Sequence, residues 1–302
     1  MKVTYSVLSI GLSLILLTGG CSSLERLESN SNKQVNKGEG TGASDQNVIG
    51  VQDYTGEGLV LPNSKGNNKI SPEKKKEIEK AVKNYFISNY KTKIILHNIV
   101  GNQDGFTAFV ESTDEPKFHT YAIVSTNADN VKTLKGQVEN GIEGGLYAII
   151  YKDKIRELKR YLTNVKNSYQ ITGRRTEAIN NTSTSGFTTQ DFYITPLDES
   201  LENLGKQYIE NPQSTMEKVN SMKHYDIDPS NLLITIQLYM KEENVKPDID
   251  VLNKVVEGLK KSNNLPPGNY VVYLNGNKIY KDTGTGSEEN QLQSKDGTII
   301  IK

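Results

Sequence analysis

Residues 71–90, SPEKKKEIEKAVKNYFISNY, contain the strongest signal for regular structure in the chain. Ser71 can cap a helix, Pro72 suits its first position, and Glu73 favours its first turn. Apolar residues then recur at helical spacing on one face, namely Ile78, Ala81, Val82, Tyr85, Phe86 and Tyr90. On the other face glutamates interrupt the lysines, which is typical of a solvated surface rather than a contact with anionic lipid. The stretch therefore predicts an amphipathic helix.

Three strand-like runs follow this helix. The turn sequence GNQDG separates KIILHNIV (93–100) from GFTAFVES (105–112), and KFHTYAIVS (117–125) comes after a break at Pro116. Short connections of this kind favour antiparallel pairing. We expect the helix to pack on one face of the resulting sheet.

Two further helices are predicted at 137–151 and 152–169. The glycines of NGIEGG (140–145) mean either that the backbone approaches a neighbour closely or that the first of these helices begins late, and we expect the late start. Helices from the region 138–169 are expected to cover the second face of the sheet, because strands with apolar residues on both faces rarely face water.

The C-terminal half predicts a second set of helices and strands. Residues 172–190 have the composition of an exposed loop or domain boundary. Beyond them the sequence predicts helices at 197–210, 215–223 and 248–261, a strand at 232–240, a hairpin around Asn275-Gly276 and a last strand in GTIIIK. The expected fold is α+β, with helices packed on mainly antiparallel sheets in an N-terminal module (48–171) and a C-terminal module (191–302). Each module would contain a helix followed by three strands, an order that either duplication or chance can explain.

Residues 1–20 have the pattern of a signal peptide. Lys2 provides a basic start, and Val3 to Leu17 form an apolar run with few polar interruptions. This run is shorter than the roughly 20 apolar residues that a membrane-spanning helix needs. Small residues follow it, as at a cleavage site.

Cys21, the only cysteine of the chain, comes directly after Gly20. The stretch LTGGCSS (17–23) resembles a bacterial lipobox, although Thr18 holds the place where leucine is commonest. The resemblance implies cleavage between Gly20 and Cys21 and conversion of Cys21 to an N-acyl, S-diacylglycerol cysteine, with acyl chains such as palmitate. In the alternative interpretation Cys21 is a small apolar residue at the end of a membrane helix.

Residues 21–47 predict a flexible tether that begins at the lipidated cysteine. Ser, Asn, Gly, Lys and Glu dominate this segment, so it cannot bury enough apolar surface to offset the entropy of ordering. The tether would hold the folded part away from the extracytoplasmic face of the cell membrane.

Several phrases in the first module resemble a known family: VQDYTGEG (51–58), LHNIVGNQDG (96–105), EPKFHTYAIV (115–124) and GQVENGI (136–142). They are similar to segments of a family of unknown function that comprises surface lipoproteins of low-GC Gram-positive bacteria, of the staphylococcal and bacillus type. The resemblance extends from residue 48 to the C-terminus. It implies a shared fold and location, and no catalytic residues.

His97 and His119 are the candidates for a metal site, because both fall in strands of the same predicted sheet. Glu111 or Glu115 could complete such a site. The alternative is that both histidines pack beside aromatic neighbours in the sheet, and we expect this arrangement, with no metal and no cofactor. Catalytic residues are not predicted, since the chain has no Gly-x-Ser-x-Gly motif and its acids fall mostly beside lysines on helix faces.

The composition favours a binding function. The 36 basic residues balance the 36 acidic ones, which gives no electrostatic reason to expect nucleic acid as a partner. Tyrosine outnumbers phenylalanine 16 to 6, and tyrosine rings suit surfaces that are half in water. We expect a membrane-anchored extracytoplasmic lipoprotein that binds an envelope or extracellular protein or polymer. The alternative is a cell-envelope enzyme such as a wall-polymer hydrolase.

The predicted helix face can be tested by substitution. Val82→Asp should destabilise the protein by several kcal/mol, because it buries an unpaired charge. Lys75→Asp, on the solvated face, should change stability by less than about 0.5 kcal/mol. Equal effects of the two substitutions in a denaturant titration would show that the helix face is assigned wrongly.

Overall fold

The structure is a computed structural model. It describes residues 47–62, 64, 70–134, 136–184, 186–222, 224–294 and 299–301. The predicted signal peptide (1–20), Cys21 and all of the tether except Asn47 lie outside the described residues. Within those ranges, no helix is both long and apolar enough to cross a membrane.

Helix α1 (Pro72–Tyr90) packs on an antiparallel sheet, as predicted. The Ser71 hydroxyl caps it by accepting a hydrogen bond from the Lys74 backbone N–H at 3.2 Å. Ile78, Val82 and Phe86 are fully buried on its inner face. The strand order is β2-β3-β4-β5, with bounds β2 (Ile94–Gly101), β3 (Gly105–Ser112), β4 (His119–Ser125) and β5 (Val131–Lys132).

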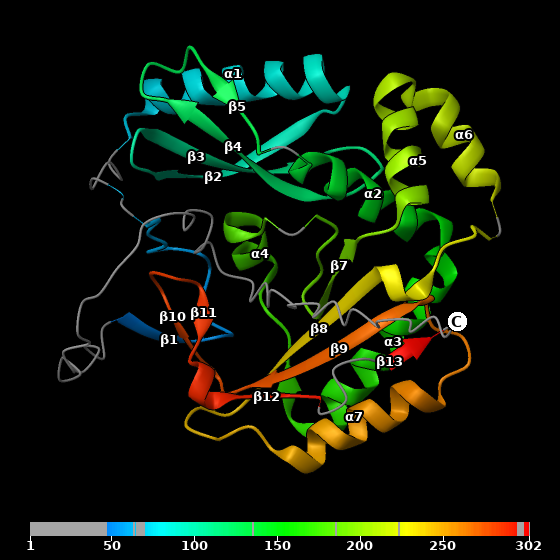
Figure 1. The fold of residues 1–302 in the computed structure, drawn as a ribbon. Helices are drawn as coiled ribbons and strands as arrows, with labels where there is room; N and C mark the ends of the chain where they lie inside the picture. The colour runs from blue at the N-terminus through cyan, green and yellow to red at the C-terminus, as the bar shows by residue number, and fades with distance from the viewer. Residues whose placement is uncertain are drawn as a thin grey trace, which may run out of the picture.

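Helix α4 (Thr176–Thr182), rather than the helices of the region 138–169, covers the second face of this sheet. It contacts β2 and β3, and Figure 1 shows it on the side of the sheet opposite α1. Ala178 and Ile179 are buried, so the interpretation of 172–190 as an exposed loop was wrong, and the alternative of a domain boundary stays a prediction. Leu61 packs against Val100 and Phe109 of this sheet. The helix is short and mostly polar, and tertiary contacts rather than a long apolar repeat stabilise it.

Helices α2 (Gln137–Ile150) and α3 (Lys152–Tyr169) match the predicted ranges closely. The expected late start of α2 was wrong, because its glycines lie inside the helix at close contacts. A Cβ atom on Gly141 would lie 2.9 Å from the Phe118 ring, and one on Gly145 would lie 2.8 Å from the Lys117 carbonyl oxygen. These glycines let α2 approach the backbone that leads into β4.

The second sheet is built around a parallel pair, β8 (Leu232–Met240) and β9 (Gly268–Asn275). Helix α7 (Ile249–Lys261) connects the two strands, as a parallel connection requires. Antiparallel strands flank the pair: β6 (Ile171–Thr172), β7 (Phe192–Pro196), β12 (Gln291–Gln293) and β13 (Ile299–Ile301). Short 3-10 turns at 229–231 and 288–290 precede β8 and β12, and helices α5 (Glu199–Glu210) and α6 (Pro212–Ser221) pack beside α2. The fold is α+β, with helices on mainly antiparallel sheets.

The predicted hairpin around Asn275-Gly276 does not form. Strand β10 (Lys278–Tyr280) leaves β9 and pairs with β1 (Val48–Gly50) and β11 (Thr285–Gly286). Asn277 fixes the change of direction, because its buried side-chain amide donates hydrogen bonds to the carbonyls of Met240 and Lys241 at 3.0 and 2.9 Å. Strand β12 pairs with β9 in its place.

Contacts cross between the two predicted modules. One hydrophobic core includes Val82 of α1, Leu146 of α2 and Leu274 of β9. Strand β1 pairs with β10 from the far end of the chain, and α2 packs against both β7 and α5. The division at 48–171 and 191–302 stays a prediction.

The close approach of α2 can be tested with two neighbouring glycines. Gly145→Ala should destabilise the protein by about 1–3 kcal/mol, because the backbone at Lys117 must move. Gly144→Ala is the matched control, since its nearest neighbours would lie at an ordinary contact distance of 3.5 Å. It should be neutral or stabilise the helix by up to about 1 kcal/mol. Chemical denaturation of both variants measures the difference, and an equal response would contradict the close packing.

Candidate functional site

The structure brings His97 and His119 together on one face of the β2–β5 sheet, on either side of Glu111. The His97 Nε2 lies 3.0 Å from a Glu111 carboxylate oxygen, and Glu111 pairs with His119 in the register of β3 and β4. The hydrogen bond with His97 lowers the pKa of Glu111, and the nearby His119 ring acts in the same direction. Glu111, rather than Glu115, is therefore the carboxylate neighbour.

His119 lies beneath α4 and contacts it directly. Its Nε2 lies 3.0 Å from the Asn180 side-chain oxygen, and burial lowers the pKa of the ring. Its buried Nδ1 has no hydrogen-bond partner in the part of the chain that the structure describes. Across the described residues, no group of three or more His, Cys, Asp and Glu side chains is placed to hold a metal ion. His97, Glu111 and His119 therefore form a polar contact between the sheet and α4. Asn98 adds to this contact, because its side-chain amide donates a hydrogen bond to the Asn181 carbonyl.

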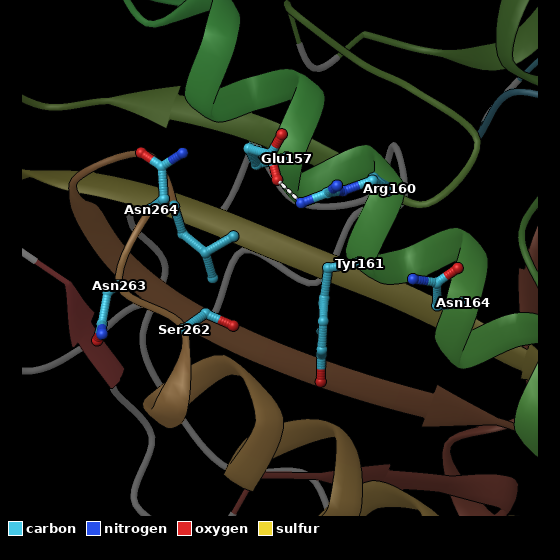
Figure 2. Close-up of a pocket in the computed structure, with 8 residues that line it drawn as sticks. Glu157, Arg160, Tyr161, Asn164, Ser262, Asn263 and Asn264 are labelled. Atoms are coloured by element: carbon cyan, nitrogen blue, oxygen red, sulfur yellow. Dashed lines mark hydrogen bonds and ion pairs between the residues drawn. The ribbon is translucent and has the colours of Figure 1, made fainter.

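A solvent-accessible pocket of about 310 Å³ lies between α3 and the loop that follows α7, and is called the α3–α7 pocket here. Figure 2 shows an ion pair between Glu157 and Arg160 at its rim, and Tyr161 reaching from α3 toward α7. Its lining residues are Glu157, Arg160, Tyr161, Asn164, Ser262, Asn263, Asn264 and Leu265.

Tyr161 is held rigidly at the base of this pocket. Its hydroxyl donates a hydrogen bond to the Val255 carbonyl at 2.7 Å, and burial raises the pKa of the phenol to about 12. Gly258 makes the approach possible, because a Cβ atom there would collide with the Tyr161 hydroxyl. Leu265, which is 3% exposed, completes an apolar base. The ring is thus a neutral, fixed surface at any physiological pH.

Three asparagines lie at the edges of this pocket. Asn164 comes from α3, and Asn263 and Asn264 come from the loop after α7; all three are exposed. Their side-chain amides make no hydrogen bond with any other described residue. Sequence reasoning missed this pocket because its two walls are about a hundred residues apart in the chain. The run SNN at 262–264 predicts only a loop.

A second, shallower pocket of about 410 Å³ lies between α1 and the turn before β5, with Asn84, Tyr85 and Asp129 among its lining residues. The Asp129 carboxylate accepts a hydrogen bond from the Ser125 hydroxyl. The two pockets contain one carboxylate each among their described lining residues, Glu157 in the first and Asp129 in the second. Neither resembles the paired carboxylates of a glycoside hydrolase.

Glu143 is a buried acid that the sequence analysis did not single out. It is 4% exposed, in the interface between α2 and α5. A Cβ atom on Gly205 of α5 would lie 2.8 Å from the Glu143 Cγ, so the two helices meet at this side chain. Burial raises the pKa of Glu143 to about 7; the charges of Glu202 and Glu139 add to the increase, and Lys206 opposes it.

Comparison with known proteins identifies the family. Residues 41–302 match the family described as Protein of unknown function (DUF1672). The chain belongs to the DUF1672 family. Its structure is similar to the crystal structure of a DUF1672 family protein from Staphylococcus aureus subsp. aureus Mu50, with a TM-score of 0.67 and 20% identity over 85% of this chain and 98% of that one. At this identity the likeness shows a shared fold. No curated protein matches the chain significantly.

Membership in DUF1672 confirms the predicted resemblance of the chain to a family of unknown function. The match begins at residue 41, before the first described strand, and extends to the end of the chain. It assigns no catalytic or binding residues.

The buried acid predicts a pH dependence for this DUF1672 chain. Burial raises the pKa of Glu143 from 4.5 to about 7 on folding, so its contribution to stability is fully present below 4.5 and is lost as the pH rises to about 7. Relative to Glu143→Gln, the wild-type chain should lose on the order of 3 kcal/mol over this range. Urea titrations at several pH values measure the difference.

A matched control is Glu210→Gln, at the exposed C-terminal end of α5. This variant should follow the wild-type pH dependence. A constant stability difference between wild type and Glu143→Gln at every pH would show that Glu143 does not bind the extra proton.

Proposed function

We propose that this chain is a lipoprotein anchored at the extracytoplasmic face of the cell membrane and that its folded part is a binding module. The observation that carries the proposal is the position of Cys21, the only cysteine, directly after an apolar run and the small residues Thr18, Gly19 and Gly20. A free thiol in an oxidising compartment is reactive, and a thioether bond to diacylglycerol removes the free thiol.

The anchor and the tether would determine how far from the membrane the folded part lies. Cleavage after Gly20 would free the Cys21 amine for acylation, and the thiol would carry diacylglycerol. Several acyl chains on one residue give stable membrane attachment, whereas a single chain gives only marginal binding. A tether over residues 21–47 would have a root-mean-square reach of about 30 Å. The module could then contact polymers or proteins close to the membrane.

Two observations favour binding over hydrolysis of a wall polymer. Each of the two pockets contains one carboxylate, and Glu157 already forms an ion pair with Arg160. Hydrolysis of a glycosidic bond generally requires two carboxyl groups flanking the bond. In addition, β2 forms an edge of the β2–β5 sheet and presents Ile95, which is 47% exposed. Such an edge can pair with an extended partner segment.

Lipidation gives the proposal its test. Mass spectrometry of the protein from the membrane fraction of a Gram-positive host should find Cys21 at the N-terminus, carrying diacylglycerol and acyl groups. Cys21→Ser should retain residues 1–20 or appear in the medium, while Ser22→Ala should stay in the membrane fraction as the wild type does. Recovery of an unmodified Cys21 within the membrane-bound wild-type chain would reject the anchor.

A further inference from the structure

The α3–α7 pocket has the chemistry of a site for an uncharged carbohydrate. We propose that it binds one or two sugar units of a neutral glycan. The inference rests on the proposed binding function and names the ligand class. A volume of about 310 Å³ lies at the lower end of the range of known ligand pockets, which suits a ligand of this size.

The polar groups of the pocket match sugar hydroxyl groups. A side-chain amide offers both a donor and an acceptor, and Asn164 and Asn264 place such amides at the two edges of the pocket. A sugar hydroxyl also donates and accepts, so neighbouring hydroxyls can each exchange hydrogen bonds with one amide. These amides make no side-chain hydrogen bond within the described chain, and are free to bind a ligand without breaking an internal contact.

The base of the pocket suits the apolar face of a sugar ring. Tyr161 and Leu265 form this base, and Figure 2 shows Tyr161 between α3 and α7 with Ser262 opposite it. Because the Tyr161 hydroxyl is already bonded to the Val255 carbonyl, the ring is held in place before a ligand binds. A rigid aromatic ring contributes contact area at a low cost in conformational entropy.

The charge of the lining favours a neutral ligand. Its ionisable side chains other than the Tyr161 phenol are Glu157 and Arg160, and their mutual ion pair cancels both charges. An anionic ligand would have to compete with Glu157 for Arg160. Peptide recognition by strand addition would need an open strand edge, whereas this pocket is formed by a helix and a loop.

The experiment titrates the full chain, solubilised in detergent, with four probes: cellobiose and N,N′-diacetylchitobiose as neutral disaccharides, digalacturonic acid as an anionic one, and the peptide Ala-Gly-Ala. Isothermal titration and nuclear magnetic resonance of labelled asparagine side chains report binding. At least one neutral disaccharide should bind and shift the Asn164 and Asn264 signals. Its affinity should not change with salt, because the ligand carries no charge.

Variants locate the site. Asn164→Ala and Asn264→Ala should each weaken binding of that disaccharide by about tenfold, since each removes an amide that bonds the ligand. Asn84→Ala is the matched control, an exposed asparagine in the pocket beside α1, and should bind as the wild type does.

Absence of binding by both neutral disaccharides would overturn the proposal, as would preferential binding of digalacturonic acid or the peptide. Equal weakening by Asn84→Ala would also overturn it, because the site would then not be the α3–α7 pocket. The same detergent-solubilised sample is analysed for lipidated Cys21. A lipidated chain that binds no sugar therefore refutes the ligand class alone, whereas an unlipidated chain that binds sugar refutes the anchor alone.

Discussion

The packing of α2 at contact distances too short for a Cβ atom is the constraint on which the rest of the fold depends. Gly141 and Gly145 bring this helix against the segment that enters β4, and Gly205 of α5 brings a second helix against it from another side. Helix α2 also contacts β7 of the second sheet. It therefore joins the β2–β5 sheet to the β8–β9 sheet through one core, and a displacement of α2 would open both interfaces.

Close helix packing also shapes the chemical environment of single residues. Glu143 is buried because α2 and α5 meet at Gly205, and that burial is the main reason why its pKa is near 7. Gly258 plays a similar part on α7, where the absence of a side chain lets Tyr161 of α3 bond the Val255 carbonyl. The fixed position of Tyr161 then defines the base of the α3–α7 pocket. In both places a glycine leaves room for a larger side chain of a neighbouring helix, and so fixes where that side chain lies.

Several elements could be predicted from the sequence because their signals are local. The cap at Ser71 and the apolar spacing from Ile78 onward predicted α1, and the turn residues between apolar runs predicted β2, β3 and β4. The proximity of His97, Glu111 and His119 was also predictable in part, since antiparallel pairing of consecutive strands brings such residues to one face. The role of these three residues as a polar contact was not predictable, because the contact depends on α4, a helix without a long apolar repeat.

Local sequence patterns predict the class of the fold and the bounds of the long amphipathic elements, and they contain a single cysteine after an apolar run. Long-range contacts are needed to explain why β10 pairs with β1 instead of β9, why α4 covers the second face of the β2–β5 sheet, and why α3 and the loop after α7 form a pocket. The two groups of features differ in how far apart in the chain the interacting residues lie. Periodicity, caps and turns act over a few residues, whereas these three features depend on buried hydrogen bonds and close contacts between segments far apart in the chain.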